Sequence, residues 1–201
     1  GNYSYKEALG TLKNYFGKQL DLVGKSSTAD FRTKADVESE AAIIKVLSAR
    51  FPRYSILSEE IGFIDKKSDY TFIVDPLDGT YNFTLGIPNF TVSIGLLNKD
   101  EIIAGVVYQP ILDRIYRAEI GKGAFMNDTK LAVSTVSDIT AATVAYTCSY
   151  QTPAEYANNL FRNLDEKDVK RVLDDWSVAF DFCMLASGKI EAFVNNECEL
   201  Y

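Results

Sequence analysis

The spacing of apolar residues predicts two helices within the first fifty residues. Residues 3–22 carry apolar side chains three and four positions apart, which indicates one buried helical face rather than an interface. A second helix is expected to open at residues 33–36, with its buried face marked by Val37, Ala41, Ile44, Leu47 and Phe51. Thr33 and Asp36 match a capping box in which Asp replaces Glu or Gln, and this local role alone could explain Asp36.

The rest of the chain has the pattern of short strands mixed with helices. β-branched and aromatic runs predict strands at 54–57, 72–75, 90–97, 102–108, 114–118, 141–147 and 190–194. The second of these should break at Pro76. Helices are expected at 153–164 and 177–186, the latter with Cys183 as a small apolar residue. We expect Phe125, after two glycines, to fill core space, and a boundary between two units near residues 134–140.

Composition narrows the possible chemistry. The chain has 201 residues, 47% of them hydrophobic, which is enough for a substantial core. It contains no histidine, which excludes catalytic or metal-binding His, and its three cysteines lack the spacing of a zinc site. A net charge of −7 argues against general nucleic-acid binding. No apolar run approaches the roughly 18 residues that span a bilayer, and no signal-peptide pattern is visible, so we expect a cytoplasmic protein.

Two carboxylates at the end of a predicted strand form the best candidate site. Asp75 and Asp78 lie where the 72–75 run ends, and the following Gly79-Thr80 pair can open a helical turn with free backbone N–H groups. Carboxylates beside such a turn suit Mg²⁺ and a phosphate together. The simpler alternative is that both aspartates only form a turn. Glu59, directly after the 54–57 run, can converge on the same sheet edge.

These elements together resemble the inositol monophosphatase family of magnesium-dependent sugar phosphatases. The resemblance rests on Ser58-Glu59-Glu60, on the run from Asp75 to Phe83 (D-P-L-D-G-T-Y-N-F), and on Gly86-Ile87-Pro88 and Val92-Ser93-Ile94-Gly95. Their order and distances agree with the family signature, and the similarity runs from about Lys25 to the last residue. The spacing of Lys25 and Asp36 also matches a family pairing of a mobile lysine with an aspartate near the metals.

The resemblance implies a role for each of these residues. Two or three Mg²⁺ ions would be bound by Glu59, Asp75, Asp78 and the Leu77 backbone carbonyl, with Asp75 bridging two of them. Glu59 and Thr80 would orient the attacking water, Asp36 would polarise the Thr80 hydroxyl, and Lys25 would belong to the catalytic loop. Backbone N–H groups of Gly79 and Thr80 would hold phosphate oxygens.

Two departures from the family pattern concern the substrate and the length of the chain. Family members that hydrolyse inositol phosphate carry a Glu where Asn195 stands, so Asn195 is the candidate substrate-binding residue and inositol is not favoured. The segment from Asp175 to Ala179 also lacks the small residues of the family pattern. A further metal-binding Asp of the family would align one residue beyond Tyr201, so we expect this chain to lack one ligand and to be a poor phosphatase.

The sequence therefore predicts an α+β protein with the layered αβαβα sugar-phosphatase fold. Residues 1–135 should form a metal-binding α+β domain with an antiparallel sheet, and residues 136–201 part of a C-terminal α/β domain. The expected function is Mg²⁺-dependent hydrolysis of a small phosphate monoester by a homodimer with no nucleic-acid or membrane partner. The alternative is a regulatory or binding protein on the same fold, although Glu59, Asp75, Asp78 and Thr80 are all retained.

Overall fold

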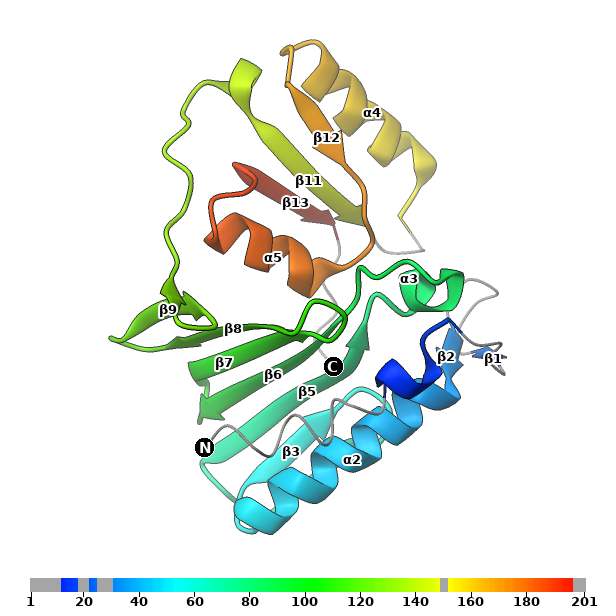
Figure 1. Ribbon diagram of the computed structural model, residues 1–201, viewed down its shortest axis with the longest axis vertical. Helices are drawn as coiled ribbons and strands as arrows, with labels where there is room; N and C mark the ends of the chain where they lie inside the picture. Colours follow the sequence, from blue (N-terminus) through cyan, green and yellow to red (C-terminus); the bar gives the residue numbers. More distant parts are fainter. Residues whose placement is uncertain (1–11, 18–21, 25–30, 149–151, 197–201) are drawn as a thin grey trace.

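The computed structural model describes residues 12–17, 22–24, 31–148 and 152–196, and it has five layers (Figure 1). Helix α2 (Lys34–Arg50) covers one face of an eight-stranded sheet. Helix α5 (Val178–Ala186) lies between that sheet and a three-stranded sheet, whose other face is covered by α4 (Ala154–Asp165). The predicted α+β class and αβαβα layering are confirmed. No helix in the described part of the chain is long and apolar enough to cross a membrane.

The large sheet is mixed, not antiparallel as expected. Its strand order is β10-β9-β8-β7-β6-β5-β3-β4, and the β3–β5 pair alone is parallel. The strands are β3 (Ser55–Ser58), β4 (Gly62–Ile64), β5 (Tyr70–Asp78), β6 (Thr91–Asn98), β7 (Glu101–Gln109), β8 (Arg114–Glu119), β9 (Gly123–Met126) and β10 (Thr129–Lys130). Parallel neighbours end at the same sheet edge, so β3 and β5 bring their following residues together.

Strand β5 does not break at Pro76, contrary to the sequence prediction. It pairs with β6 as far as Asp78, opposite Thr91, and the register shifts between Asp75 and Asp78. A bulge accommodates a residue without a backbone N–H, so Pro76 remains within the strand. The bulge keeps Leu77 buried while Asp75 and Asp78 stay half-buried.

The buried face of α2 is also different from the prediction. Val37 is 42% exposed and Ala41 is exposed, whereas the fully buried positions are Ala35, Asp36, Ser39, Glu40 and Ile43. The helix is therefore rotated relative to its apolar pattern. Polar residues take the inner face of its first turns because they bond to the sheet edge beneath.

Of the expected helix at 3–22, the described residues include a helical segment at 12–15, and the helix does not extend to Leu22. Residues 12–15 are helical, and Leu12 is fully buried, but Leu22 lies in strand β1 (Leu22–Gly24). This strand pairs with β2 (Phe31–Thr33), which leads into α2. Thr33 is thus a strand residue.

The second sheet is parallel, in the order β12-β11-β13. It comprises β11 (Thr143–Cys148), β12 (Arg171–Leu173) and β13 (Ala192–Asn196), preceded by the short 3₁₀ helix η1 (Ile139–Ala141). Helices α4 and α5 are confirmed to within a residue of their expected bounds, whereas β12 was not predicted and β13 lies two residues later than expected. The division into domains at residues 135 and 136 stays a prediction.

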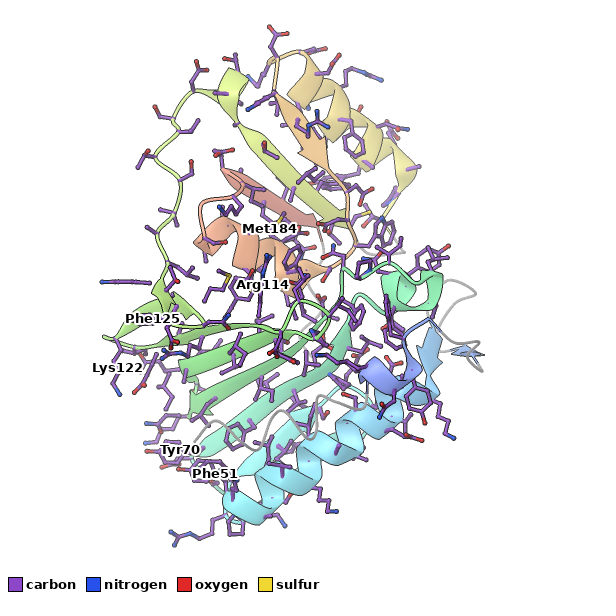
Figure 2. The ribbon with its side chains drawn as sticks, viewed as in Figure 1. Phe51, Tyr70, Arg114, Lys122, Phe125 and Met184 are labelled. Carbon is purple, nitrogen blue, oxygen red and sulfur yellow. The ribbon has the colours of Figure 1, made fainter. Side chains whose placement is uncertain are left out.

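Aromatic residues secure opposite ends of the large sheet. From helix α3 (Thr80–Leu85), Phe83 packs edge-on against Phe90 with ring centroids 4.9 Å apart. Phe51 and Tyr70 mark the opposite end in Figure 2, where Tyr54 stacks on the Tyr70 ring and makes a tilted contact with the Phe51 ring. Phe125 is not a core residue as expected. It is half-buried, and the Arg117 guanidinium lies 4.8 Å from its ring centroid.

Candidate functional site

The site is built on the parallel ends of β3 and β5. Ser58 is level with Val74 in the sheet, so Glu59 and Asp75 follow at adjacent positions on the same edge. The carboxyl Oδ1 of Asp75 accepts a hydrogen bond from the Leu77 backbone N–H at 3.0 Å, which fixes the side chain within the bulge. Sequence order alone predicted this convergence, and the structure brings the two residues together.

Negative charge accumulates around Asp75. Burial raises the pKa of Asp75 well above its ordinary value, and the nearby carboxylates of Asp78, Glu59 and Asp36 raise it further. The hydrogen bond from the Leu77 N–H acts in the opposite direction and lowers the pKa. Four predicted site residues therefore share one electrostatic environment, in which a positive charge would be strongly stabilised.

A tight turn carries the chain from β5 into α3. Gly79 has a φ of +83°, and a Cβ atom there would lie 3.0 Å from the Asn89 carbonyl oxygen, so both backbone conformation and space require glycine. Thr80 begins the helix, and its hydroxyl lies 3.2 Å from Asp36 Oδ1 and 3.0 Å from the Leu77 carbonyl oxygen. One hydroxyl proton serves these two acceptors. The predicted Asp36–Thr80 contact is therefore present.

Asp78 connects the large sheet to helix α5. Its Oδ2 accepts hydrogen bonds from the Ser177 hydroxyl, from the Thr91 hydroxyl at 3.1 Å and from the Ala179 N–H at 3.2 Å. Burial raises the pKa of Asp78, and these donors counteract the effect. Ser177 precedes α5 but makes no capping bond to that helix, because its hydroxyl is directed to Asp78.

The site residues suit a divalent cation by their chemistry. Carboxylate and carbonyl oxygens are the ligands of hard cations, and the carboxylates of Asp78, Glu59 and Asp36 lie close enough to Asp75 to add to the effect of burial on its pKa. As the side chains stand, no three His, Cys, Asp or Glu residues within the described ranges form a ready metal-ligand group. To bind a metal ion, the Asp78 oxygen that faces Ser177 and Thr91 would have to coordinate the ion while keeping these hydrogen bonds, or the carboxyl group would have to rotate.

The remaining predicted residues have different outcomes. Lys25 lies outside the described residues. Asn195 is half-buried in β13, where it is level with Thr147 of β11. Thr147 donates to Asp181 of α5, so this register position belongs to the region between the second sheet and α5. The roles assigned to all these residues stay predictions.

Sequence reasoning missed the residues that support the site. Ser39 donates its hydroxyl to the Pro76 carbonyl oxygen at 3.1 Å, and Glu40 accepts hydrogen bonds from Ser58, Glu60 and Ile61. The signal was available: Asp36, Ser39 and Glu40 are spaced as one helical face. Ser177, by contrast, reaches Asp78 across 99 positions, and no local pattern indicates such a contact.

Comparison with known proteins gives a consistent result. The model of the inositol monophosphatase family matches residues 3–201. The chain is 36% identical over 174 residues to the Nus factor SuhB of Pasteurella multocida, covering 83% of this chain and 63% of that protein. It is also 36% identical over 187 residues to the inositol-1-monophosphatase of Mesorhizobium japonicum, covering 91% and 70% of the respective chains.

A solved structure agrees with this assignment. The extragenic suppressor protein SuhB from Bartonella henselae superimposes with a TM-score of 0.91 at 33% identity, covering 96% of this chain and 75% of that one. The chain belongs to the inositol monophosphatase family. At the level of the family, this membership supports metal-dependent phosphatase chemistry.

Proposed function

We propose that this chain is part of a Mg²⁺-dependent hydrolase of small phosphate monoesters. The observation that carries the proposal is the convergence of Glu59, Asp75 and Asp78 at one sheet edge, beside the Thr80–Asp36 contact. Unaided hydrolysis of phosphate monoesters is extremely slow, so the site has to stabilise charge on the transferring phosphoryl group.

Glu59, Asp75, Asp78 and the Leu77 carbonyl are the groups that would hold the ions. Bound Mg²⁺ neutralises charge on phosphoryl oxygens and lowers the pKa of a coordinated water. The bulge in β5 is what allows two side chains and one carbonyl from a single strand to serve the same site.

Thr80 and Asp36 position the attacking water. The Thr80 hydroxyl proton has two acceptors, Asp36 Oδ1 and the Leu77 carbonyl oxygen. If that carbonyl were engaged as a ligand, the proton would be directed to Asp36, and the Thr80 oxygen would be free to accept a hydrogen bond from water. Glu59 would accept the second hydrogen bond of that water, and the N–H groups of Gly79 and Thr80 would hold phosphate oxygens.

The substrate is proposed to be a sugar or nucleotide phosphate other than inositol 1-phosphate. Asn195 carries no charge and offers a different hydrogen-bond pattern from the Glu of inositol-hydrolysing relatives. Trp176 stands in a segment that also departs from the small-residue pattern of the family around the substrate. A clear preference for inositol 1-phosphate over a panel of sugar and nucleotide phosphates would contradict this proposal.

The second candidate is a regulatory protein with weak or no catalysis. It is favoured by relatives named Nus factor SuhB, one of which is 36% identical to this chain. Retention of Glu59, Asp75, Asp78 and Thr80 favours the enzyme, because a binding protein has no need of this set. The cytoplasmic location, the homodimer and the absence of nucleic-acid partners stay predictions.

The deciding experiment is a phosphatase assay with and without Mg²⁺. We expect Mg²⁺-dependent release of phosphate from at least one monoester, abolished by Asp78→Asn. The matched control is Asp100→Asn, which makes the same change at an exposed turn. Equal turnover by wild type and Asp78→Asn would refute the site, and a full-length protein inactive on the whole panel would favour the regulatory alternative.

A further inference from the structure

The inner face of α2 bonds to every segment of the candidate site. Asp36 accepts from Thr80 at 3.2 Å, Ser39 donates to the Pro76 carbonyl at 3.1 Å, and Glu40 accepts from the segment after β3. These three residues occupy positions i, i+3 and i+4 of one helix, so a rigid element sets their mutual spacing.

Glu40 makes the most extensive of these contacts. Its Oε1 accepts hydrogen bonds from the Ser58 hydroxyl, the Glu60 N–H at 3.0 Å and the Ile61 N–H at 3.1 Å. The donors lie on both sides of Glu59, and they leave the backbone of that segment little freedom. A single carboxylate oxygen thus fixes the turn that presents Glu59 to Asp75.

The burial of Glu40 is hard to explain by packing alone. The residue is 1% exposed, and its Oε2 has no hydrogen-bond partner among the described residues. A buried carboxyl group is unfavourable unless its oxygens are satisfied, so an apolar residue would serve the core better. Hydrogen bonds to an ionised acceptor are stronger than neutral ones, which suits a turn that has to be held in one geometry.

We infer that Glu40 is a positioning residue that fixes the Ser58–Ile61 turn and thereby aims Glu59 at the cation site. The inference rests on the proposed function, since it assigns a task to Glu40 within that site. Glu40 touches neither substrate nor cation in this role; it acts through Glu59. The rival explanation is that Glu40 only ties α2 to β3 and contributes to stability alone.

Two substitutions separate these explanations. Glu40→Gln keeps an acceptor oxygen for the three donors but loses the charge that strengthens the bonds. Glu40→Ala removes the acceptor and leaves two backbone N–H groups unpaired. The matched control is Glu38→Gln on the same helix, where the side chain is 43% exposed and bonds Tyr15 rather than the site.

The experiment measures Mn²⁺ binding by calorimetry, without substrate, alongside thermal unfolding in metal-free buffer. Loss of a group that orients a ligand lowers metal affinity by about 10- to 100-fold. We expect Glu40→Gln to raise the Mn²⁺ dissociation constant at least severalfold and Glu40→Ala to raise it further, with Glu38→Gln unchanged. In the hydrolysis assay the Glu40→Gln variant should lose kcat at saturating Mn²⁺ more than it changes KM.

The outcomes test the positioning role of Glu40 separately from the proposed function. A Glu40→Gln variant that binds Mn²⁺ as wild type does, whatever its unfolding temperature, overturns the positioning role and leaves the proposed function standing. A wild-type protein that binds no Mn²⁺ overturns the proposed function and this inference with it. If Glu40→Ala does not fold, Glu40→Gln alone decides the question.

Discussion

The fold brings carboxylates close together in two places, and their negative charge is compensated differently in each. The β5 cluster, formed by Asp75 and Asp78 with Glu59, lies half-exposed at the edge of the large sheet. The α5 pair, formed by Asp175 and Asp181, lies where α5 meets the second sheet. In both groups negative charges are forced together by the fold, and something positive has to compensate for them.

In the α5 pair the compensating species is a proton. Asp181 is fully buried, and its Oδ2 accepts a hydrogen bond from Thr147 at 3.1 Å. The Oδ1 atoms of Asp175 and Asp181 are buried without any donor within the described structure. Burial and the neighbouring Asp175 raise the pKa of Asp181 to about 8. A pKa of about 8 keeps the Asp181 carboxyl group protonated at neutral pH.

The β5 cluster is arranged for a different solution. Its carboxylates are partly accessible to solvent. Fixed polar groups surround them and orient their oxygen atoms: the Leu77 carbonyl, the Thr80 hydroxyl and the donors that face Asp78. A proton neutralises one carboxylate, whereas a divalent cation can be shared by several oxygens at once. The difference in access and ligand geometry distinguishes a candidate cation site from a closed structural pair.

The largest effect should follow from Asp75→Asn. Removing the central carboxylate of the β5 cluster should lower Mg²⁺-dependent turnover at least about a thousandfold, or roughly 4 kcal/mol of transition-state stabilisation. Because neighbouring charges disfavour ionised Asp75, the metal-free variant should unfold at an equal or higher temperature than wild type. Activity assays and metal-free thermal unfolding on the same samples test both statements.

A fall in both activity and metal-free stability would instead show that Asp75 is a structural residue, and the contrast between the two groups would fail. Asp100→Asn, in an exposed turn, is again the matched control and should change neither quantity.

Thr80→Ala should have the next largest effect. Loss of the hydroxyl that orients water should lower kcat by about 10- to 100-fold while KM changes less, because positioning matters most in the transition state. Thr80→Ser keeps the hydroxyl between Asp36 and the Leu77 carbonyl, so it should retain most of the activity. Steady-state kinetics decide the point: a Thr80→Ser variant as impaired as Thr80→Ala would count against a role for the hydroxyl.

The β5 cluster was predictable from sequence because its members are local. Each member follows a strand-like run: Glu59, Asp75, Asp78 and Thr80. The parallel pairing of β3 with β5 then brings the ends of these runs to the same sheet edge. The inner face of α2 was mispredicted for a physical reason. Apolar spacing favoured Val37, but bonds from Asp36, Ser39 and Glu40 to the sheet edge outweigh the burial of a few apolar side chains.

The α5 pair was beyond sequence reasoning altogether. Asp175 and Asp181 meet through the turn that begins α5, and the partner of Asp181 on β11 is 34 positions away. Strand β12 is only three residues long and carries too short an apolar pattern to be recognised. The break predicted at Pro76 was wrong because a bulge keeps this proline within strand β5.

Asp181→Asn tests directly whether Asp181 holds a proton at neutral pH. A carboxyl group whose pKa is raised on folding binds its proton more tightly in the folded state. Its contribution to stability is therefore greatest below the unfolded value of 3.8 and is lost progressively as pH rises toward about 8. An asparagine can donate to Asp175 and accept from Thr147 at every pH, so the variant should be more stable than wild type near pH 8.

Thermal unfolding from pH 4 to pH 9 measures this difference. Because Asp75 and Asp78 also have raised pKa values, the scan is run with and without excess Mg²⁺, which should suppress the contribution of the β5 cluster alone. If the variant and wild type show parallel curves in Mg²⁺, the pKa of Asp181 is not raised by the fold.

The smallest effect is expected at Trp176, which connects the two groups. It stands between Asp175 of the α5 pair, whose carbonyl accepts hydrogen bonds from Asn82 and Asn89, and Ser177, which donates to Asp78. With both neighbours fixed, Trp176 is held at a φ of +56°, a left-handed conformation that is unfavourable for a bulky residue by about 1–3 kcal/mol.

Trp176→Gly should relieve this strain, and its free energy of unfolding should exceed that of Trp176→Ala by about 1 kcal/mol, after the higher chain entropy of glycine is subtracted. Trp176→Ala keeps most of the backbone strain while also removing the ring, so the difference between the two variants isolates the backbone. Urea unfolding followed by circular dichroism is the suitable measurement, because Trp176 is the only tryptophan and its fluorescence is lost. A Trp176→Gly variant no more stable than Trp176→Ala would show that the turn between the two carboxylate groups is not strained, and that Asp175 and Ser177 do not constrain it.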